Sequence, residues 1–252
     1  MKKILLVSGC SWTDKQFTSD HHPEIDTSWP KWPELLAQKL DMECVNLGRC
    51  GAGNEYIYNS LLEEICRTSS NKIGMVIPMW SGAERRDFQD FSIILGDRKK
   101  MRGRIKEDNW VHNRIDQPGG LFVSHRPGAH YFVHRSLRYW YSFQCLCEAL
   151  GIKYKQIQGV SLYRRTKNEK EFIPRNRWHK EVARSMFESP VFGCIDTNNF
   201  IGFPATDYMG GVTLTNVLRD SEGKDSVHIS DEDRHPNALG QQIIADYIYE
   251  NL

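Results

Sequence analysis

Two residues suited to hydrolytic chemistry lie near opposite ends of this 252-residue chain. Ser11 stands in the segment Gly-Cys-Ser-Trp-Thr, just after the apolar run at residues 4–7, and His235 comes directly before Pro236. A serine hydroxyl is a weak nucleophile until an imidazole accepts its proton, and that imidazole needs a carboxylate to fix its tautomer. Ser11 alone would also suit a turn or a helix cap. Together, Ser11 and His235 are interpreted as a nucleophile and its general base.

The acid of such a triad has more than one candidate. Asp231, Glu232 and Asp233 all lie within four residues of His235. The same three carboxylates would also stabilise the positive N-terminal end of the helix expected to follow, an effect of about 0.3–1 kcal/mol each. Both roles can coexist, and the sequence leaves Glu232 and Asp233 open as the triad acid.

The elements that must position these residues alternate between strand and helix. A short apolar run predicts a strand over residues 3–8, and leucines at helical spacing predict a helix over 33–40. Such alternation predicts a parallel sheet covered by helices, with ligands bound at the carboxyl ends of the strands. Further strands are expected at 42–47, 73–79 and 152–160, and further helices around 57–65, 134–150, 178–187, 213–218 and from about Pro236.

Residues 81–133 interrupt this pattern with charged, glycine-rich and aromatic sequence that has no clear period. Fifty residues without any structure would be unusual inside a compact domain. We therefore expect one domain over 1–252 that carries an insertion at about 81–133, with partial structure of its own, over the top of the sheet. The basic run at 98–106 lies in this insertion.

Composition argues against several classes of partner. Lys and Arg number 33 against 32 acidic residues, so no net charge draws the protein to nucleic acid or to anionic lipid. No apolar stretch suggests a signal peptide or a membrane span, which predicts a cytoplasmic protein. Seven cysteines without paired spacing, and adjacent histidines at His21 and His22 on a polar loop, predict neither a disulfide framework nor a metal site.

The blocks around Ser11 and His235 resemble those of the SGNH/GDSL hydrolase family, whose nucleophile lies in a Gly-Asp-Ser-like block and whose base lies in an Asp-x-x-His-Pro-like block. Cys10 stands where the family usually has Asp. Glu232 has the family spacing to His235, and Asp233 has the family residue type. The resemblance implies a flavodoxin-like three-layer α/β/α sandwich that hydrolyses carboxylic esters, of small molecules or of carbohydrates, through an acyl-enzyme.

The resemblance also implies an oxyanion hole, and here the chain departs from the family. Gly51, in the segment at 46–54, matches the glycine that donates a backbone N–H to the oxyanion. The family's third block supplies an Asn side chain, but this chain has Gly82 at the expected place. Asn54 or the main chain at Ser81 and Gly82 could replace that donor. Alternatively, the site is impaired.

Rival interpretations follow from that departure. The insertion, the Trp-Ser sequence of the third block and the Gly-Cys-Ser block together resemble divergent SGNH-like proteins of phages. A catalytically impaired binding module with the same fold is the main alternative to an esterase, and nucleic-acid processing through the basic insertion is another. Gly48, Gly51 and Gly53 lack the spacing of a dinucleotide fingerprint, so no cofactor is expected.

Overall fold

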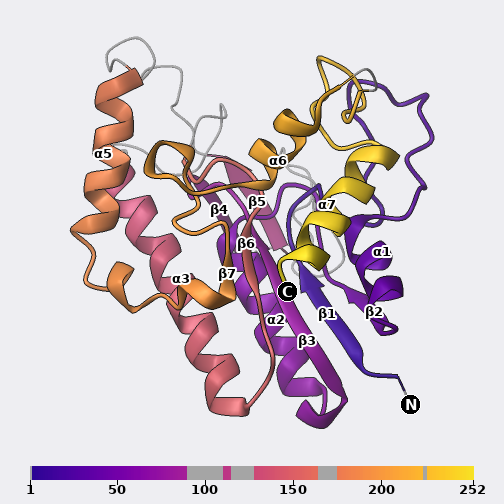
Figure 1. Cartoon of the computed structure of the whole chain (residues 1–252), viewed down its shortest axis with the longest axis horizontal. Coiled ribbons are helices and arrows are strands. Elements are labelled where there is room, and N and C mark those ends of the chain that lie inside the picture. The colour runs from indigo at the N-terminus through magenta and orange to yellow at the C-terminus, as the bar shows by residue number, and fades with distance from the viewer. Residues whose placement is uncertain (1, 90–109, 115–127, 164–174, 224–225) are drawn as a thin grey trace, which may run out of the picture.

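A five-stranded parallel sheet forms the centre of the computed structural model, which describes residues 2–89, 110–114, 128–163, 175–223 and 226–252 (Figure 1). The strand order is β2-β1-β3-β6-β7. Numbered along the sheet strands alone, this is the 2-1-3-4-5 order of flavodoxin-like folds, as the sequence predicted. The strands are β1 (Ile4–Ser8), β2 (Glu43–Asn46), β3 (Ile73–Trp80), β6 (Gln156–Gln158) and β7 (Phe200–Ile201).

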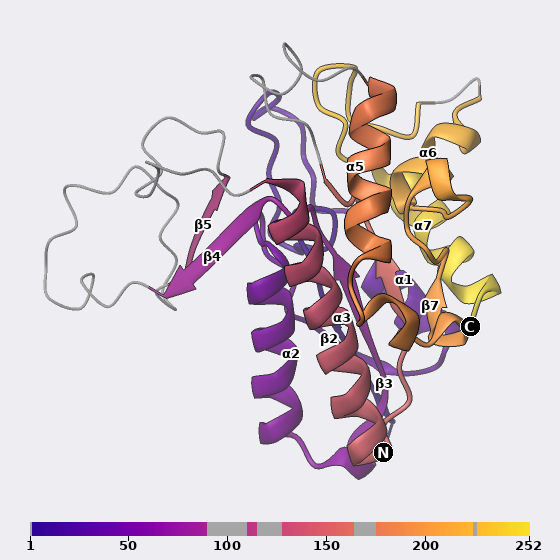
Figure 2. The same ribbon diagram turned by 90° about the vertical axis from the view of Figure 1, so that its left-hand side faces the viewer.

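Helices cover both faces of this sheet and produce three layers (Figures 1 and 2). Each face of the sheet has its own cluster of buried apolar side chains, in which Leu6 and Val76 point to one side and Leu5 and Val7 to the other. This alternation follows from the two-residue period of a strand. One layer holds α2 (Asn54–Arg67), α3 (Ala129–Leu150) and α5 (Arg175–Phe187), and the other holds α1 (Trp32–Lys39), α6 (Leu214–Ser221) and α7 (Ala238–Glu250).

The structure differs from the sequence-based elements mainly at their ends. The strand expected over 152–160 is paired as a strand only over β6, with Tyr154 adding one isolated bridge to Val76. β7 has two residues, too few for a periodic signal. Pro236 precedes the first turn of α7 rather than lying in it, because the side chain of Asn237 caps that helix by accepting from Gly240 N–H at 3.0 Å.

The described part of the predicted insertion contains an antiparallel hairpin of β4 (Arg85–Gln89) and β5 (Trp110–Arg114), which Figure 2 shows beside the N-terminal end of α2. Asp87 attaches this hairpin to α2. Its carboxylate accepts from the backbone N–H of Gly53 and of Tyr56, both at 2.9 Å. A carboxylate on these N-terminal N–H groups satisfies donors that the helix leaves unpaired. The basic run at 98–106 lies outside the described residues.

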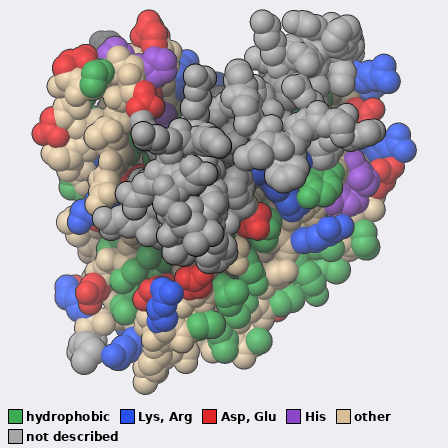
Figure 3. Space-filling view, turned by 180° about the vertical axis from the view of Figure 1, so that it is seen from behind, with side chains coloured by type: hydrophobic (Ala, Val, Ile, Leu, Met, Phe, Trp, Pro, Cys, Tyr) green, Lys and Arg blue, Asp and Glu red, His purple; other side chains and the backbone are tan. Residues whose placement is uncertain are grey.

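The described surface carries both signs of charge. Figure 3 shows acidic and basic side chains interspersed on one face, in agreement with the near-zero net charge of the sequence. Within the described residues, no helix is long and apolar enough to cross a membrane.

Candidate active site

Ser11 lies in a tight turn at the carboxyl end of β1. The carbonyl of Cys10 accepts from Thr13 N–H at 2.8 Å and from Asp14 N–H at 3.1 Å, which closes the turn around Ser11. Thr13 packs so closely on Gly9 and Gly48 that a Cβ on either glycine would come within 2.6 Å of its side chain. The glycines of the first two blocks therefore allow these segments to pack against each other.

His235 reaches Ser11 from the segment before α7. The His235 Nε2 atom lies 2.8 Å from Ser11 Oγ, within hydrogen-bonding distance. On the other side of the ring, Nδ1 contacts Oδ1 of Asp233. The ring of Phe17 covers His235, with a centroid distance of 4.3 Å. The hydroxyl of Ser11, the imidazole of His235 and the carboxylate of Asp233 thus form a continuous series of contacts, of the kind in which an imidazole can accept a proton from a serine.

Asp233, and not Glu232, is the carboxylate that contacts the histidine. Asp233 is 2 % exposed, whereas Glu232 and Asp231 are exposed at the surface. Hydrogen bonds from its own backbone and from Ser230 lower the pKa of Glu232, so this carboxylate interacts away from the imidazole. Of the two acids that the sequence left open, Asp233 has the contact and Glu232 lacks it. Asp233 lies two residues before His235, one residue fewer than the spacing in the family block.

Ser19 also contacts the carboxylate of Asp233 and was missed at the level of sequence. Its hydroxyl donates to Oδ2 of Asp233 and accepts from His22 N–H at 2.9 Å. His22 in turn places Nε2 2.8 Å from Ser230 Oγ, which accepts from Asp233 N–H at 2.9 Å. Ser19 lies 214 residues from Asp233 in a polar stretch without any motif, so no spacing signal could identify it.

Burial has opposite consequences for the two titratable groups of this arrangement. Burial lowers the pKa of His235 below its ordinary value, although Asp233 opposes this shift. For Asp233, burial raises the pKa, but hydrogen bonds from Ser19 and His235 outweigh it and leave the pKa below the usual range. At neutral pH the imidazole is therefore neutral and the carboxylate ionised, as a general base and its orienting acid require.

Gly51 lies on the loop that follows β2, in a conformation that favours glycine. Its φ is +86°, in the left-handed region, and a Cβ there would meet His112 at 3.3 Å. Cys50, the residue before Gly51, is hydrogen-bonded to the turn around Ser11. Its N–H donates to Oδ2 of Asp14 at 2.7 Å. Asp14 was not singled out from the sequence. It connects the turn around Ser11 to the loop that carries Gly51.

Asn54 and Gly82 do not have the surroundings expected of oxyanion donors. Asn54 is buried, with Oδ1 accepting from Ser81 N–H at 2.7 Å and Nδ2 donating to Ser136 Oγ at 3.0 Å. Its amide therefore connects α2, β3 and α3. The carboxylate of Glu84 packs on Gly82, where a Cβ would lie 2.6 Å from Oε2, and a second negative charge beside it would be repelled.

Arg85 brings a positive charge to this part of the molecule. Its Nη1 donates to the carbonyl of Ala52 at 2.9 Å, one residue beyond Gly51. A Cβ on Gly53 would lie 2.8 Å from Arg85 Cβ, so the arginine packs directly on the loop that follows Gly51. Its charge also contributes to the lowered pKa of His235. Arg85 opens β4, just after the third block, and was not identified from the sequence.

The residues considered for metal binding form no metal-binding group in the described part of the chain, where no cluster of three or more His, Cys, Asp or Glu occurs. His22 contacts Glu24 and Ser230.

No protein-family model and no curated protein matches this chain. Similar solved structures include a protein assigned to the G-D-S-L lipolytic family from Desulfitobacterium hafniense, with 14 % identity over 99 % of both chains and a TM-score of 0.48. An acetyl-xylooligosaccharide esterase from Geobacillus aligns over 99 % of this chain and 93 % of its own, with 11 % identity and a TM-score of 0.47.

Proposed function

We propose that this protein is a serine hydrolase that cleaves carboxylic esters through an acyl-enzyme. The observation that carries the proposal is the 2.8 Å contact between Ser11 Oγ and His235 Nε2, on a ring whose Nδ1 contacts buried Asp233. This arrangement supports nucleophilic catalysis because each group is in the protonation state that its role needs.

In the proposed reaction, Ser11 Oγ attacks the ester carbonyl while His235 Nε2 takes the hydroxyl proton. Asp233 stabilises the imidazolium that forms, and His235 then gives the proton to the leaving alkoxide as the carbon–oxygen bond breaks. A water molecule next attacks the acyl-Ser11 carbonyl, with His235 again accepting a proton. Collapse of that second intermediate returns the proton to Ser11 and releases the carboxylic acid.

The negative charge that develops on the carbonyl oxygen needs donors on the opposite side. We assign the backbone N–H groups of Gly51 and Ser11 to this role, since each follows a strand that ends at the same edge of the sheet. Arg85 is proposed in place of the family Asn as an electrostatic stabiliser, because Asn54 is committed to Ser81 and Ser136. A guanidinium carries a full positive charge, which an amide does not.

The substrate is proposed to be a carboxylic ester of a small molecule or of a carbohydrate, including O-acetyl esters. The rival is a binding module that has kept the fold without turnover. Because the family Asn is missing from the third block, this rival must be tested directly. It predicts that Ser11 is unreactive although it contacts His235.

Labelling with a fluorophosphonate probe separates the two. We expect the wild-type protein to be labelled, with phosphorus bonded to Ser11 Oγ, and Ser11→Ala to remain unlabelled. Ser28→Ala serves as the matched control, since Ser28 is exposed and hydrogen-bonded only to nearby Asp26 among described contacts. Absence of labelling in folded wild-type protein, or equal labelling of Ser11→Ala, would favour the binding module.

A further inference from the structure

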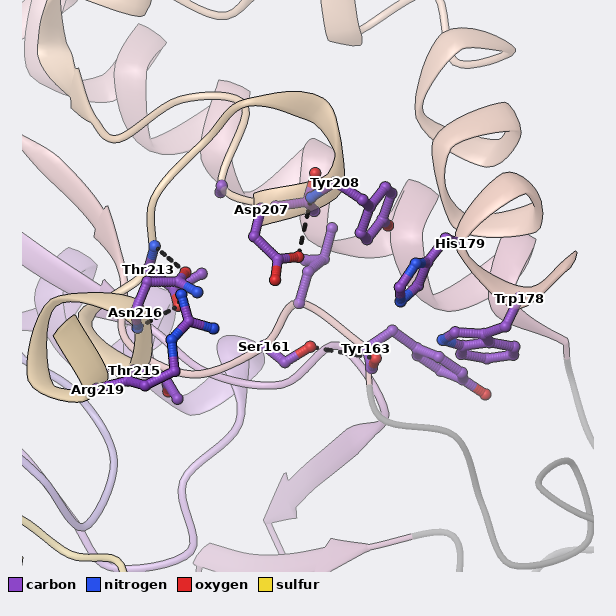
Figure 4. A pocket seen from close by; sticks show the side chains of 13 residues that line it. Ser161, Tyr163, Trp178, His179, Asp207, Tyr208, Thr213, Thr215, Asn216 and Arg219 are labelled. Carbon is purple, nitrogen blue, oxygen red and sulfur yellow. Dashed lines mark hydrogen bonds between the residues drawn. The ribbon is translucent and has the colours of Figure 1, made fainter. Parts of the chain in front are cut away.

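A cavity of about 190 Å³ lies beyond the carboxyl ends of β6 and β7 (Figure 4), and neither Ser11 nor His235 lines it. It is smaller than the roughly 300–1,000 Å³ of sites that enclose drug-sized ligands, and so it fits a single ring. Segments after β6 and β7 form its walls together with α5 and α6. Its lining includes Ser161, Tyr163, His179, Asp207, Asn216 and Arg219.

The cavity shares the carboxyl edge of the sheet with the triad. Adjacent strands are about 4.8 Å apart, and β6 is two strands from β1, so their ends are separated by roughly 10 Å. A backbone hydrogen bond of 2.6 Å from Ala83 to Leu162 joins the segment lining the cavity to the segment that leads into Arg85. One extended substrate could therefore occupy both places.

Aromatic rings form one side of this cavity, and they are already stacked on each other. His179 lies on Tyr208 with a centroid distance of 4.4 Å and an interplanar angle of 6°, and Tyr163 lies on Trp178 at 4.9 Å. Figure 4 shows these four rings together on the α5 side. Tyr163 is also stacked on Phe132, with a centroid distance of 5.7 Å, so both of its faces are covered. In the His179–Tyr208 pair each ring covers only one face of the other, so this pair supplies the aromatic face for a ligand.

Polar side chains of several kinds form the opposite side, around α6. Arg219 and Asp207 bring opposite charges. Asn216 Oδ1 accepts from both the N–H and the hydroxyl of Thr213, at 2.8 and 2.7 Å, so Nδ2 is the end of this amide that can donate to a ligand. Ser161 adds a hydroxyl. These groups offer donors and acceptors at once, as a ring with several hydroxyl groups requires.

Anionic ligands and acyl chains each conflict with part of this lining. The Asp207 carboxylate would repel a phosphate or carboxylate placed near Arg219. An acyl chain would leave the charged and amide groups without partners, at a cost of about 1–3 kcal/mol each. A neutral sugar ring satisfies both walls, because its hydroxyls pair with charged and amide side chains while its C–H face packs on an aromatic ring.

We propose that this cavity binds a neutral sugar ring, as the second unit of a carbohydrate whose ester is cleaved at Ser11. This inference rests on the proposed hydrolase function and narrows its substrate class to acylated oligosaccharides. It assigns specificity to residues after β6 and β7 and on α6, at a distance from the reacting atoms.

The test measures saccharide binding separately from turnover. Ser11→Ala protein is titrated by ligand-observed NMR with glucose, xylose, galactose and N-acetylglucosamine, with the β-1,4-linked trimers of glucose and xylose, and with inorganic phosphate. At least one saccharide should bind, with at least fivefold weaker affinity after Arg219→Gln or Asp207→Asn. Arg184→Gln is the matched control, since Arg184 is an exposed arginine on α5 paired with Glu188. Folding of each variant is checked by its melting temperature.

The kinetic readout uses two substrates in the Ser11-containing protein. Asp207→Asn and Arg219→Gln should leave kcat/KM for p-nitrophenyl acetate unchanged and lower it at least fivefold for the acetylated trimer of the saccharide that binds. Binding of phosphate but of no saccharide, or saccharide binding unaffected by both variants, would overturn the inference.

The two proposals fail in distinguishable ways. Fluorophosphonate labelling of Ser11 without saccharide binding would reject the sugar site and keep the hydrolase. Saccharide binding that depends on Arg219, in a protein whose Ser11 is never labelled, would reject the hydrolase and support carbohydrate recognition by this cavity.

Discussion

Two His–Asp pairs with a buried carboxylate occur in the described part of the chain, and their surroundings differ. In one, His235 Nδ1 contacts Asp233, and in the other, His112 Nδ1 lies 2.8 Å from Asp87. Both carboxylates are almost fully buried. The far nitrogen differs, since His235 Nε2 contacts Ser11 Oγ whereas His112 Nε2 is buried without a hydrogen-bond partner among the described residues.

The other contacts of each carboxylate explain the contrast. Asp87 holds the N–H groups of Gly53 and Tyr56, and thereby fixes β4 to the start of α2. Asp233 holds the hydroxyl of Ser19, and its histidine keeps 31 % of its side chain exposed against 7 % for His112. The His235–Asp233 pair thus has the surroundings that the proposed chemistry needs, whereas the His112–Asp87 pair has a carboxylate that caps a helix.

Replacement of Asp233 by Asn should have the largest effect on activity. Asn keeps the shape but offers an amide to Nδ1, which favours the wrong tautomer, and we expect kcat for p-nitrophenyl acetate to fall by about 10⁴-fold. The melting temperature should change little. Glu232→Gln is the control, and a larger loss of kcat for Glu232→Gln than for Asp233→Asn would return the acid's role to Glu232.

Replacement of Asp87 by Ala should instead act on stability. Removing one partner of a buried pair costs roughly 3–5 kcal/mol, which corresponds to a fall in melting temperature of about 6–20 °C for a chain of this size. Fluorophosphonate labelling of Ser11 well below the transition should persist. Asp220→Ala, at an exposed site on α6, is the control. Lost labelling with an unchanged melting temperature would make the Asp87–His112 pair the functional one.

The sequence predicted the fold well because its signals are periodic and local. Apolar runs and helical faces identified β1, β3, α2 and α3, and glycine in the left-handed conformation at Gly151 ends α3 as expected. The strands β6 and β7 were harder, since their pairing depends on neighbours brought together by the fold. A two-residue strand has no period to detect.

The candidate site was predictable where a motif exists and not where the fold creates the contact. Ser11, His235 and Gly51 lie in short blocks whose residue types suggest their chemistry. Choosing Asp233 over Glu232 required the geometry of the turn. Ser19 and Arg85 approach the site from segments without a motif, and Asn54 could not be recognised as a structural amide until Ser81 and Ser136 were placed around it.

Arg85 lies on the same strand as Asp87, and its charge acts on His235. It therefore links the His112–Asp87 pair to the His235–Asp233 pair. If it stabilises the developing oxyanion, Arg85→Gln should lower kcat by about 10²–10³-fold with little change in KM. Because its charge contributes to the lowered pKa of His235, the acid limb of the rate profile should also move to higher pH. Arg86→Gln, the next residue along β4, is the control. Equal kcat for Arg85→Gln and wild type would remove Arg85 from the oxyanion site.

Substitution of Ser19 tests whether the position of the Asp233 carboxylate depends on the hydrogen bond that Ser19 donates to it. Ser19→Ala removes a hydrogen bond to a charged group, worth about 1.5–3 kcal/mol, and should lower kcat by roughly tenfold to a hundredfold. KM should stay within about twofold, since Ser19 touches no substrate in the proposed mechanism. Ser19→Thr keeps the hydroxyl and should recover most of the rate. A uniform loss in both variants would indicate a packing defect rather than positioning of Asp233.

The smallest effect concerns the pH at which His235 loses its proton. Ser11 can react only while the imidazole is neutral, so activity falls as the pH drops through the pKa of His235. Burial lowers that pKa and Arg85 lowers it further, whereas Asp233 and Asp20 oppose the shift. Because the net direction is downward, kcat/KM for p-nitrophenyl acetate should reach half its plateau below about pH 6.5, the value for an unperturbed histidine. Profiles at constant ionic strength from pH 4.5 to 9, corrected for spontaneous hydrolysis, measure this midpoint. A midpoint above pH 7 would mean that Asp233 raises the pKa of His235 by more than burial lowers it. A flat profile would exclude His235 as the base.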